Sequence, residues 1–284
     1  MIYCDPQTVR NRDRLLSCSR LTQERDEVLI NQITYIIATY NSATTLKRCL
    51  ESFVDQELQN FTVVVVDGGS SDSTISIVKQ YSNIVSQFVS EPDSGIYDAF
   101  NKGVLLAKTP WVSFVGSDDY LTPIATTIFS EVFGQEDTVD YATGAVQLVS
   151  DDESIVGLIG EKWSWKRCRK RMLVAHVGSL HNMQLFNDHG LFDTKLKICG
   201  DYDFLLRVGR KLRVFHSGKI VASMSVGGIS NSFKAPFESM KVKLNNKSAS
   251  FVVAILFFLA DIFSICRRRL VKRVMWKIRS CRNI

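Results

Sequence analysis

The chain has 284 residues, of which 45% are hydrophobic, and a formal net charge of +6 at pH 7. This length and composition can bury a full core, so we expect one large domain with an appendage. The basic excess belongs to residues 267–284, which hold eight basic and no acidic side chains, whereas the remainder of the chain nets −2. The body has no basic stripe interleaved with aromatic residues, which argues against a nucleic-acid partner.

Residues 1–31 form a charged N-terminal extension, in which a helix is expected around Arg14–Ile30. The first 25 residues are polar and lack the apolar stretch of a signal peptide. Seven cysteines are scattered along the chain without CxxC pairs or metal-ligand spacing. An odd number of cysteines without a secretory leader predicts reduced thiols in a cytoplasmic setting.

Alternating strand and helix patterns run from residue 33 to residue 115. Ile33–Ala38 is rich in β-branched and aromatic residues, which predicts a strand, and residues 46–54 have apolar side chains at helical spacing. Phe61–Val66 is a continuous apolar run that suits a strand covered on both faces. Helix and strand patterns alternate from there to Trp111–Val115. This alternation predicts βαβ units, and hence an α/β fold whose sheet has helices on both sides.

The second half of the body is predicted to mix helices and strands. In chain order we expect a helix at Pro123–Phe133, strands at Tyr141–Val149 and Ile155–Ile159, an exposed basic loop over the site at Lys162–Arg171, helices at Leu180–Asp188 and Tyr202–Lys211, and an apolar stretch at Lys219–Val226. The body then spans residues 32–232, and residues 233–284 form a separate C-terminal region.

The stretch from Ser90 to Asp119 carries the most specific pattern. A turn opens it, a helix pattern starts at Ile96, and the strand at Trp111–Val115 ends directly in the sequence GSDD, which contains Asp118 and Asp119. Adjacent carboxylates at the carboxyl end of a buried strand lie where open α/β sheets bind ligands. Mg²⁺ and Mn²⁺ prefer oxygen ligands and often bind through one or two carboxylates plus substrate phosphates. For such a pair taken alone, the alternative is a solvated acidic turn.

Four motifs follow one another in this half of the chain: TYNS at Thr39–Ser42, VVVVDGGSSDST at Val63–Thr74, EPDSGIYDAFNKG at Glu91–Gly103 and GSDD at Gly116–Asp119. In this order they resemble the family 2 glycosyltransferases, especially bacterial enzymes of capsule, colanic acid and O-antigen assembly. The similarity runs from about Ile33 to about Arg207, with weaker traces to Ser230. It implies a GT-A-like fold, with a nucleotide-binding mixed sheet flanked by helices, and a nucleoside-diphosphate sugar as the donor.

The resemblance assigns the first two motifs to the base and ribose of the donor. Asp67 follows a predicted strand directly, and its carboxylate could accept a hydrogen bond from a nucleobase N–H. Thr39, Tyr40 and Asn41 are the further donor-binding candidates. The glycines after Asp67 allow the backbone to approach a ligand closely. The structural alternative is a turn in which Asp72 stabilises the N-terminus of the next helix.

The third and fourth motifs are implied to contact the diphosphate and the sugar. Asp98 and Asn101 share one face of the predicted helix and are interpreted as donor contacts, whereas Lys102 is either a further contact or a solvated lysine. Asp119 is the expected direct ligand of Mn²⁺ or Mg²⁺, and Asp118 is expected to contact the sugar or to support the metal site. The ion would bridge diphosphate oxygens and stabilise the charge of the leaving group.

A further carboxylate cluster at the start of a predicted helix supplies the candidate general base. Glycosyl transfer needs a base for the proton of the acceptor hydroxyl, and a placed carboxylate serves. The resemblance maps this role to Asp201, although Gly200 stands where many relatives have Glu. Asp203 is the rival, and it could instead pair with Arg207 four residues later. His176 is a candidate contact for the acceptor or the diphosphate, with a structural role as the alternative.

The C-terminal region contains an apolar stretch and a basic one. Ala249–Cys266 is apolar apart from Ser250, Asp261 and Ser264. It is slightly short for a membrane span of about 20 residues, and a central Asp would cost roughly 2.5–3.5 kcal/mol on insertion scales. The residues after it place an apolar helix face among basic side chains, which predicts a helix lying in the plane of an anionic membrane surface. The alternative is a solvated helix that packs on the body or on a partner.

Together these features predict an inverting glycosyltransferase at the cytoplasmic face of the membrane, either peripheral or monotopic. It would move a sugar from a nucleoside-diphosphate sugar to a hydroxyl of a lipid-linked or glycan acceptor in surface polysaccharide biosynthesis. Asp201 would deprotonate the acceptor in a single displacement, with a divalent ion on Asp119 at the departing diphosphate. Two alternatives stay open: another nucleotide-dependent transferase, such as a nucleotidyltransferase, and a catalytically silent membrane scaffold that binds nucleotide sugars.

Overall fold

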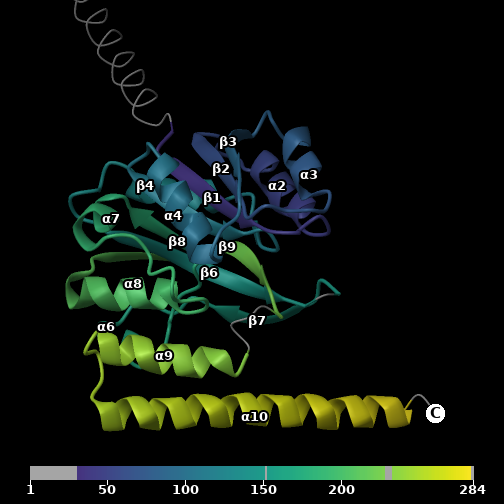
Figure 1. The fold of residues 1–284 in the computed structure, drawn as a ribbon, viewed down its shortest axis with the longest axis vertical. Helices are drawn as coiled ribbons and strands as arrows, with labels where there is room; N and C mark the ends of the chain where they lie inside the picture. Colours follow the sequence, from purple (N-terminus) through teal and green to yellow (C-terminus); the bar gives the residue numbers. More distant parts are fainter. Residues whose placement is uncertain (1–30, 151, 228–231, 283–284) are drawn as a thin grey trace, which may run out of the picture.

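The computed structural model describes residues 31–150, 152–227 and 232–282, with side chains described as far as Arg267. The helix expected at Arg14–Ile30 lies outside the described residues, and so do the side chains of most of the basic C-terminal segment. The described chain forms a mixed sheet with helices on both faces, followed by two C-terminal helices (Figure 1).

One sheet of nine strands runs through the described part of the chain, in the order β3-β2-β1-β4-β8-β6-β9-β5, with β7 paired to β6 outside this path. The strands from β1 to β4 are parallel, β8 is antiparallel to both β4 and β6, and β9 is parallel to β6. The strands are β1 (Ile33–Thr39), β2 (Phe61–Asp67), β3 (Val85–Ser90), β4 (Trp111–Gly116), β5 (Tyr120–Leu121), β6 (Tyr141–Val149), β7 (Ile155–Ile159), β8 (Ser179–Asn182) and β9 (Val214–Ser225).

The helices cover both faces of this sheet. Alternate residues of β1 serve two cores, because successive side chains of a strand point to opposite faces. Ile36 packs in the core that includes α4, α7 and α8, whereas Tyr35 and Ile37 pack in the core that includes α2 and α5. The helices are α2 (Leu46–Val54), α3 (Thr74–Gln80), α4 (Ile96–Leu106), α5 (Ala125–Phe129), α6 (Trp165–Cys168), α7 (Gln184–His189), α8 (Gly200–Val208), α9 (Lys234–Asn245) and α10 (Phe251–Arg282).

Most of the predicted elements are confirmed, and two are corrected. The strand–helix alternation through β4 is present, and β6 and β7 have the predicted bounds. The prediction of a single helix at Leu180–Asp188 is wrong, because Ser179–Asn182 is β8 and the helix begins only at Gln184. β8 is wholly buried and pairs with a strand on each side, so tertiary pairing outweighs its helical pattern. The basic loop predicted at Lys162–Arg171 contains the short helix α6, whose Cys168 is fully buried.

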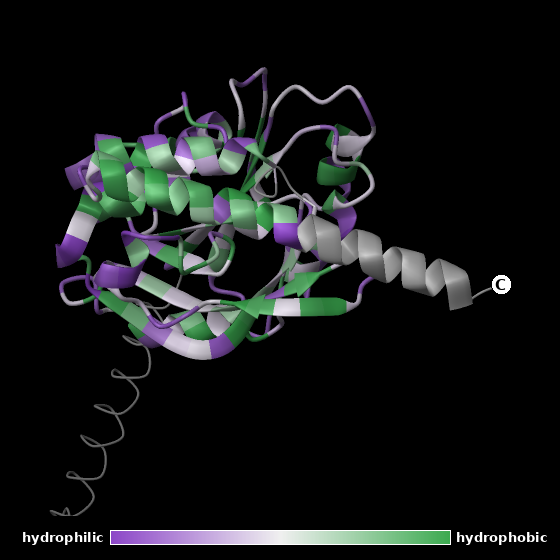
Figure 2. Cartoon of the chain, turned by 90° about the horizontal axis from the view of Figure 1, so that it is seen from below, coloured by the Kyte–Doolittle hydropathy of each residue, from purple (hydrophilic) through white to green (hydrophobic). Residues whose placement is uncertain are grey.

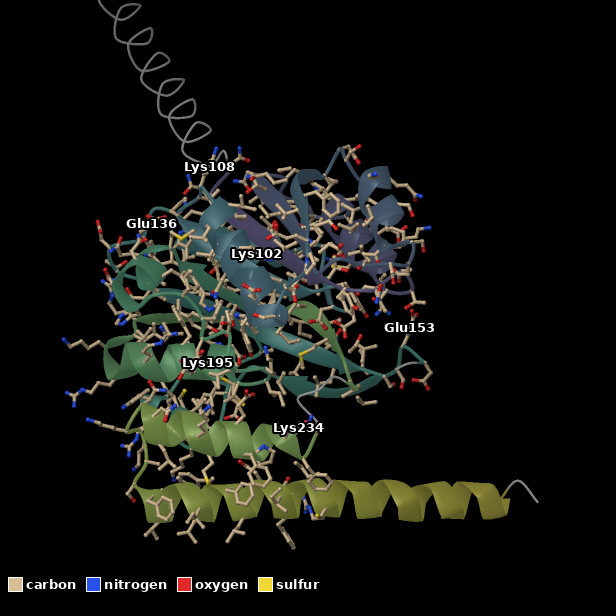
Figure 3. All side chains as sticks on the ribbon, viewed as in Figure 1. Lys102, Lys108, Glu136, Glu153, Lys195 and Lys234 are labelled. Carbon is tan, nitrogen blue, oxygen red and sulfur yellow. The ribbon has the colours of Figure 1, made fainter. Side chains whose placement is uncertain are left out.

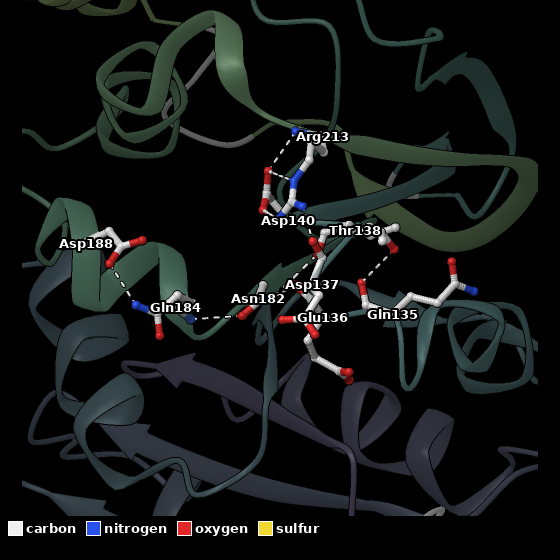
Figure 4. Close-up of polar contacts among 10 residues, drawn as sticks. Gln135, Glu136, Asp137, Thr138, Asp140, Asn182, Gln184, Asp188 and Arg213 are labelled. Carbon is white, nitrogen blue, oxygen red and sulfur yellow. Dashed lines mark hydrogen bonds and ion pairs between the residues drawn. The ribbon is translucent and has the colours of Figure 1, made fainter.

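Polar contacts fasten the loop before β6 to β8 and β9 (Figure 4). Asn182 Nδ2 donates to the Glu136 carbonyl (3.0 Å), and Arg213 forms an ion pair with Asp140. Burial acts to raise the pKa of Asp140, but the side chain and backbone amide of Arg213 hold it below its ordinary value. These contacts fix the start of β9, whose other end reaches the candidate site through Ser225.

The two C-terminal helices are stacked beneath the body. α9 packs on α8, and α10 packs on α9 at the base of the molecule in Figure 1. The rings of Phe237 in α9 and Phe258 in α10 lie 4.6 Å apart. Lys243 of α9 is 1% exposed, and its Nζ lies 3.9 Å from Asp261 of α10. Figure 2 shows α10 crossing the underside with many hydrophobic residues toward the viewer. Among the described residues, no helix has the length and apolarity needed to cross a membrane.

Candidate active site

The carboxyl ends of the parallel strands bring the candidate donor residues to one edge of the sheet. β1 pairs with β2 and β4 in a register that places Thr39 beside Asp67 and Ala38 beside Gly116. In the same way, Asp67 lies beside Ser90 at the end of β3. This edge is where ligands bind in open α/β sheets. The first, second and fourth motifs therefore meet there, as the βαβ pattern predicts.

Asp67 is fully buried, and its carboxylate organises the loop that follows it. Oδ2 accepts hydrogen bonds from the backbone amides of Gly69 (3.2 Å) and Ser70 (2.9 Å) and from the Ser90 hydroxyl (2.6 Å). Oδ1 accepts a hydrogen bond from the Ser70 hydroxyl. A nucleobase contact by Asp67 would therefore use the remaining acceptor capacity of Oδ1, while Oδ2 holds the loop.

The residues after β1 form the neighbouring wall. Asn41 has a positive φ of 47°, and its Oδ1 accepts a hydrogen bond from the Ser71 amide (2.9 Å). The Thr39 hydroxyl is buried and has no hydrogen-bond partner among the described residues. Tyr40 is 63% exposed. Asp72 accepts hydrogen bonds from backbone amides on both loops, which gives it the structural role that the sequence leaves open. An unpaired buried hydroxyl is costly, so Thr39 Oγ1 is available to a ligand.

The third motif forms the turn before α4 and the first part of that helix. Asp98 accepts a hydrogen bond from the Ser94 amide (2.9 Å) and so closes the turn. Lys102, which Figure 3 labels on α4, pairs with Glu91 at 2.8 Å. Asn101 is 8% exposed and exchanges two hydrogen bonds, of 2.9 and 3.0 Å, with the backbone of Phe192. Asn101 thus fastens α4 to the body, whereas Asp98 and Lys102 lie closer to the solvent-facing turn.

The two carboxylates of the GSDD motif converge over Gly116. A Cβ on Gly116 would lie 2.9 Å from Asp118 Oδ1 and 3.1 Å from Asp119 Oδ2, so the missing side chain makes room for both. Asp118 is exposed, whereas Asp119 is 9% exposed and accepts a hydrogen bond from the Ser225 amide (3.1 Å). Burial, and then the charge of Asp118, raise the pKa of Asp119 to about 8.

This carboxylate pair fits a divalent cation whose remaining ligands come from a bound substrate. The described residues contain no cluster of three or more His, Cys, Asp or Glu side chains that could hold a metal alone. In a Mg²⁺ or Mn²⁺ site the protein often supplies one or two carboxylates, and the substrate supplies phosphate oxygens. The raised pKa of Asp119 marks a buried acid without a matching positive charge, and a divalent ion would supply that charge.

Arg48 is a site residue that the sequence does not reveal. Its guanidinium lies 4.6 Å from the ring centre of Tyr120, and Nη2 donates to the Asp118 carbonyl (3.2 Å). Its charge also acts to lower the pKa of Asp119. In the sequence Arg48 is one basic residue in an amphipathic helix. No spacing rule connects it to a motif 70 residues later.

Asp201 lies in the first turn of α8 and lines a cavity of about 280 Å³. Its Oδ1 accepts a hydrogen bond from the Tyr202 amide (2.8 Å) and lies 3.0 Å from the Tyr97 hydroxyl, which also contacts the Ile198 carbonyl (2.8 Å). No hydrogen bond to its Oδ2 is found among the described residues. Burial, and then the charge of Asp201, raise the pKa of Tyr97, so Tyr97 stays a protonated donor. One carboxylate oxygen is thus held in place while the other is free to take a proton.

Two contacts from distant parts of the chain position Asp201. The Glu238 carboxylate of α9 accepts hydrogen bonds from three successive backbone amides before α8: those of Lys197 (2.6 Å), Ile198 (2.6 Å) and Cys199 (3.0 Å). A Cβ on Gly200 would lie 2.8 Å from ring atoms of Tyr97, so glycine lets this ring reach Asp201. Glycine at position 200 thus has a steric cause.

The other two candidates of this cluster have structural contacts. Asp203 accepts a hydrogen bond from Asn246 (2.7 Å) and pairs with Arg207 at 3.5 Å, as the four-residue spacing predicts. His176 stacks on Phe114 with ring centres 4.7 Å apart. Burial lowers the pKa of His176 to about 4 although the charge of Asp201 opposes this, so the ring is neutral. His176 Nε2 has no hydrogen-bond partner among the described residues.

Comparison with known proteins adds independent information. The model of the family described as glycosyl transferase family 2 matches residues 34–181. A PGL/p-HBAD biosynthesis glycosyltransferase of Mycobacterium tuberculosis is 30% identical over 203 residues, covering 69% of this chain and 78% of the relative.

Two solved structures are similar in fold. S. aureus TarS 1-349 in complex with UDP-GlcNAc matches with a TM-score of 0.60 and 19% identity, covering 80% of this chain and 70% of TarS 1-349. The mannosyltransferase PcManGT from Pyrobaculum calidifontis, in complex with GDP-Man and Mn²⁺, matches with a TM-score of 0.56 and 15% identity, covering 87% and 80%. These two structures support a GT-A-like fold.

The burial of Asp119 predicts that Asp119→Asn stabilises the protein when divalent ions are absent. Because the pKa is raised on folding, the folded state binds a proton that the unfolded state has lost, and this destabilises the fold increasingly as pH rises from about 4 to about 8. Asparagine does not ionise, so the melting temperature of the variant should exceed that of the wild type at about pH 8, with a smaller gap at about pH 5. Thermal unfolding in a chelator measures this. Asp55→Asn, at an exposed position whose charge does not act on Asp119, is the control with little change. An Asp119→Asn protein less stable than the wild type at the higher pH would contradict the prediction.

The contact between Gly200 and Tyr97 predicts that Gly200→Ala destabilises the protein. The added methyl group would overlap a buried aromatic ring, and overpacking of this kind costs about 1–3 kcal/mol. Gly157→Ala is the matched control, since the nearest atom to a Cβ there is a flexible Leu148 methyl at 3.4 Å. Denaturant unfolding of both variants decides the point, and equal stability of the two would show that the Tyr97 ring moves freely.

Proposed function

The chain belongs to glycosyl transferase family 2, and from this premise we propose that it transfers a sugar from a nucleoside-diphosphate sugar to an acceptor hydroxyl in an inverting displacement. The observation that carries the proposal is the pair of carboxylates over Gly116 at the edge where β1 and β2 end. The donors bound by the similar structures, UDP-GlcNAc and GDP-Man, support a nucleotide sugar.

The donor would lie across the carboxyl ends of β1, β2 and β4. We assign the base and ribose to Asp67 Oδ1, Asn41, Tyr40 and the unpaired Thr39 hydroxyl. The diphosphate and sugar would face the start of α4, whose Asp98 and Lys102 contact the turn before it through Ser94 and Glu91. Asn101 would act by holding α4, because both polar atoms of its side chain are bonded to Phe192.

A divalent ion, Mn²⁺ or Mg²⁺, would be held by Asp119 with Asp118 beside it. When bound, such an ion neutralises negative charge on the departing diphosphate. The convergence of the two carboxylates and the burial of Asp119 support this assignment, as does Mn²⁺ in the similar mannosyltransferase. Arg48 of α2 brings a positive charge to this loop, because its guanidinium donates a hydrogen bond to the Asp118 carbonyl.

Asp201 is the proposed general base. As the acceptor oxygen bonds to the anomeric carbon of the sugar, its proton passes to Asp201 Oδ2, and the bond from that carbon to the diphosphate breaks with its electron pair. The Tyr97 hydroxyl and the Tyr202 amide contact Oδ1, which leaves Oδ2 for the acceptor, and Asp201 lines the cavity. Neutral His176 lies behind this carboxylate in the aromatic cluster and is available as an acceptor contact.

The acceptor and the location follow from the C-terminal helices. One face of α10 leaves large apolar side chains between 55% and 71% exposed: Phe251, Val252, Leu256, Leu259 and Phe263. The basic residues of 267–284 follow in the sequence. An exposed apolar stripe beside a basic segment suits the plane of an anionic membrane. We therefore propose a cytoplasmic-face enzyme that glycosylates a lipid-linked or glycan acceptor in surface polysaccharide assembly, in keeping with the biosynthetic role in the mycobacterial relative's name.

A panel of nucleotide sugars tests the reaction class. With Mn²⁺ and membranes present, one donor should release a free nucleoside diphosphate together with a glycosylated product. Release of pyrophosphate would identify nucleotidyl transfer instead, and donor binding without turnover would identify a scaffold that binds nucleotide sugars.

We expect Asp201→Asn to abolish most transfer while leaving donor affinity near the wild-type value. Asparagine retains the size of the side chain but cannot take the acceptor proton, and a general base contributes about 10²–10⁴-fold in rate. Single-turnover transfer and donor titration separate the two quantities. Asp203→Asn is the control and should cost far less, because Asp203 bonds Asn246 and Arg207. A larger loss at Asp203 than at Asp201 would move the base to Asp203.

The double variant Leu256→Glu/Phe263→Glu should move the protein from the membrane fraction to the soluble fraction. Both side chains are on the exposed stripe, at 59% and 71% exposure, so the fold should tolerate the change while insertion into the membrane is lost. Leu105→Glu, at 74% exposure on α4, is the matched control and should still sediment with membranes. Sedimentation of the double variant with membranes would place the attachment elsewhere.

A further inference from the structure

The cavity beside Asp201 is built from elements far apart in the chain. It lies between the start of α8, the α9 and α10 helices, and the segment at Arg171 and Met172. Its apolar lining comes from Met172, Ile198, Tyr202, Ala235, Pro236 and Ile265. Its polar lining consists of the catalytic candidate Asp201, of Arg171 and Ser239, and of Asp261 and Ser264 from α10. α10 is thus a wall of the cavity that holds the proposed base.

We propose that this cavity is the acceptor site and that it takes an acceptor whose reacting hydroxyl is attached to an apolar group. The inference rests on the proposed glycosyl transfer and specifies its acceptor. The hydroxyl would lie at Asp201 Oδ2, and the apolar group would lie against Ile265, Ala235 and Pro236. Burial of apolar atoms against such a lining is favourable, whereas a purely polar saccharide would offer the lining no apolar surface to bury.

The two faces of α10 support this assignment. Ile265 lines the cavity and is 7% exposed. Ala254, three helical turns earlier on the same face, is fully buried. The opposite face carries the exposed stripe of Val252, Leu256, Leu259 and Phe263. The same helix therefore presents apolar side chains both to the cavity and to the outside. An acceptor carried in a membrane on an apolar chain would meet α10 first and Asp201 next.

The cavity is also connected to the donor side of the site. The Tyr97 hydroxyl contacts Asp201 at 3.0 Å, and Tyr97 stands in the first turn of α4. The turn before α4 packs against the loop of Asp67, because a Cβ on Gly68 would lie 2.6 Å from Asp93 Oδ2. The segment from Asp93 to Tyr97 therefore contacts both the loop after Asp67 and the residue proposed as the base.

The test compares acceptors that differ only in the apolar group. Full-length protein is given its donor and a set of monosaccharides, each free and as an octyl glycoside below its micellar concentration. The octyl glycoside should have a KM lower by about tenfold or more, the factor expected from burying two methylene groups. Equilibrium binding of octyl glucoside without donor gives a second readout.

Variants locate the effect. Ser264→Phe places a ring in the cavity and should remove the tenfold preference and the binding of octyl glucoside, while slow hydrolysis of the donor by water continues. Ala235→Leu fills the same cavity from α9 and should act in the same direction, should the first variant fold poorly. Leu105→Ala, at an exposed position on α4 outside both the cavity and the stripe of α10, should keep the preference.

The outcomes separate this inference from the proposed function. Equal KM values for free and octyl sugars, or a preference that survives both Ser264→Phe and Ala235→Leu, would overturn the inference while glycosyl transfer stands. Donor hydrolysis that continues in the variants shows that the donor site is intact. Absence of any turnover of nucleotide sugars by the wild type would overturn the proposed function, and the inference with it.

Discussion

β1 is hydrogen-bonded to β2 along one edge and to β4 along the other, and it is buried over its whole length. The three strands are parallel and end at Thr39, Asp67 and Gly116, which lie at the same edge of the sheet. The loops that follow the strands therefore meet at this edge. Each loop is then fixed by its own polar contacts, such as those of Asp67 with the amides after it. The arrangement of the residues proposed to bind the donor is therefore a direct result of strand pairing.

The proposed acceptor side has a different origin, because no strand end places Asp201. Its position depends on the Glu238 carboxylate at the backbone amides before α8, and on the Tyr97 ring over Gly200. Glu238 belongs to α9, which is joined to α10 through Lys243, a nearly fully buried cation 3.9 Å from Asp261. An unpaired buried charge is strongly destabilising. The two terminal helices therefore help to position Asp201, through Glu238 and through the contact between α9 and α10.

The sequence predicts what local pattern and strand order determine. The alternation up to β4, the bounds of β6 and β7, and the shared edge of Asp67 and Asp119 all follow from periodicity and from the geometry of parallel strands. β8 does not, because four residues, SLHN, become a strand only by pairing on both sides. Arg48 and Glu238 are missed because they act on residues about 40 to 70 positions away. Asn101 is placed correctly on α4, but its contact with Phe192 cannot be inferred from helical spacing.

The first turn of α4 has a thermodynamic consequence. It faces the loop of Asp67 through the preceding turn and faces Asp201 through Tyr97, so both proposed substrates would bear on the same few residues. Binding free energies that share a structural element are linked, and the linkage is reciprocal. If a bound donor orders this turn, the acceptor gains affinity by a certain factor, and a bound acceptor then strengthens donor binding by the same factor. In that case the first turn of α4 would couple two proposed sites that are built by different parts of the chain.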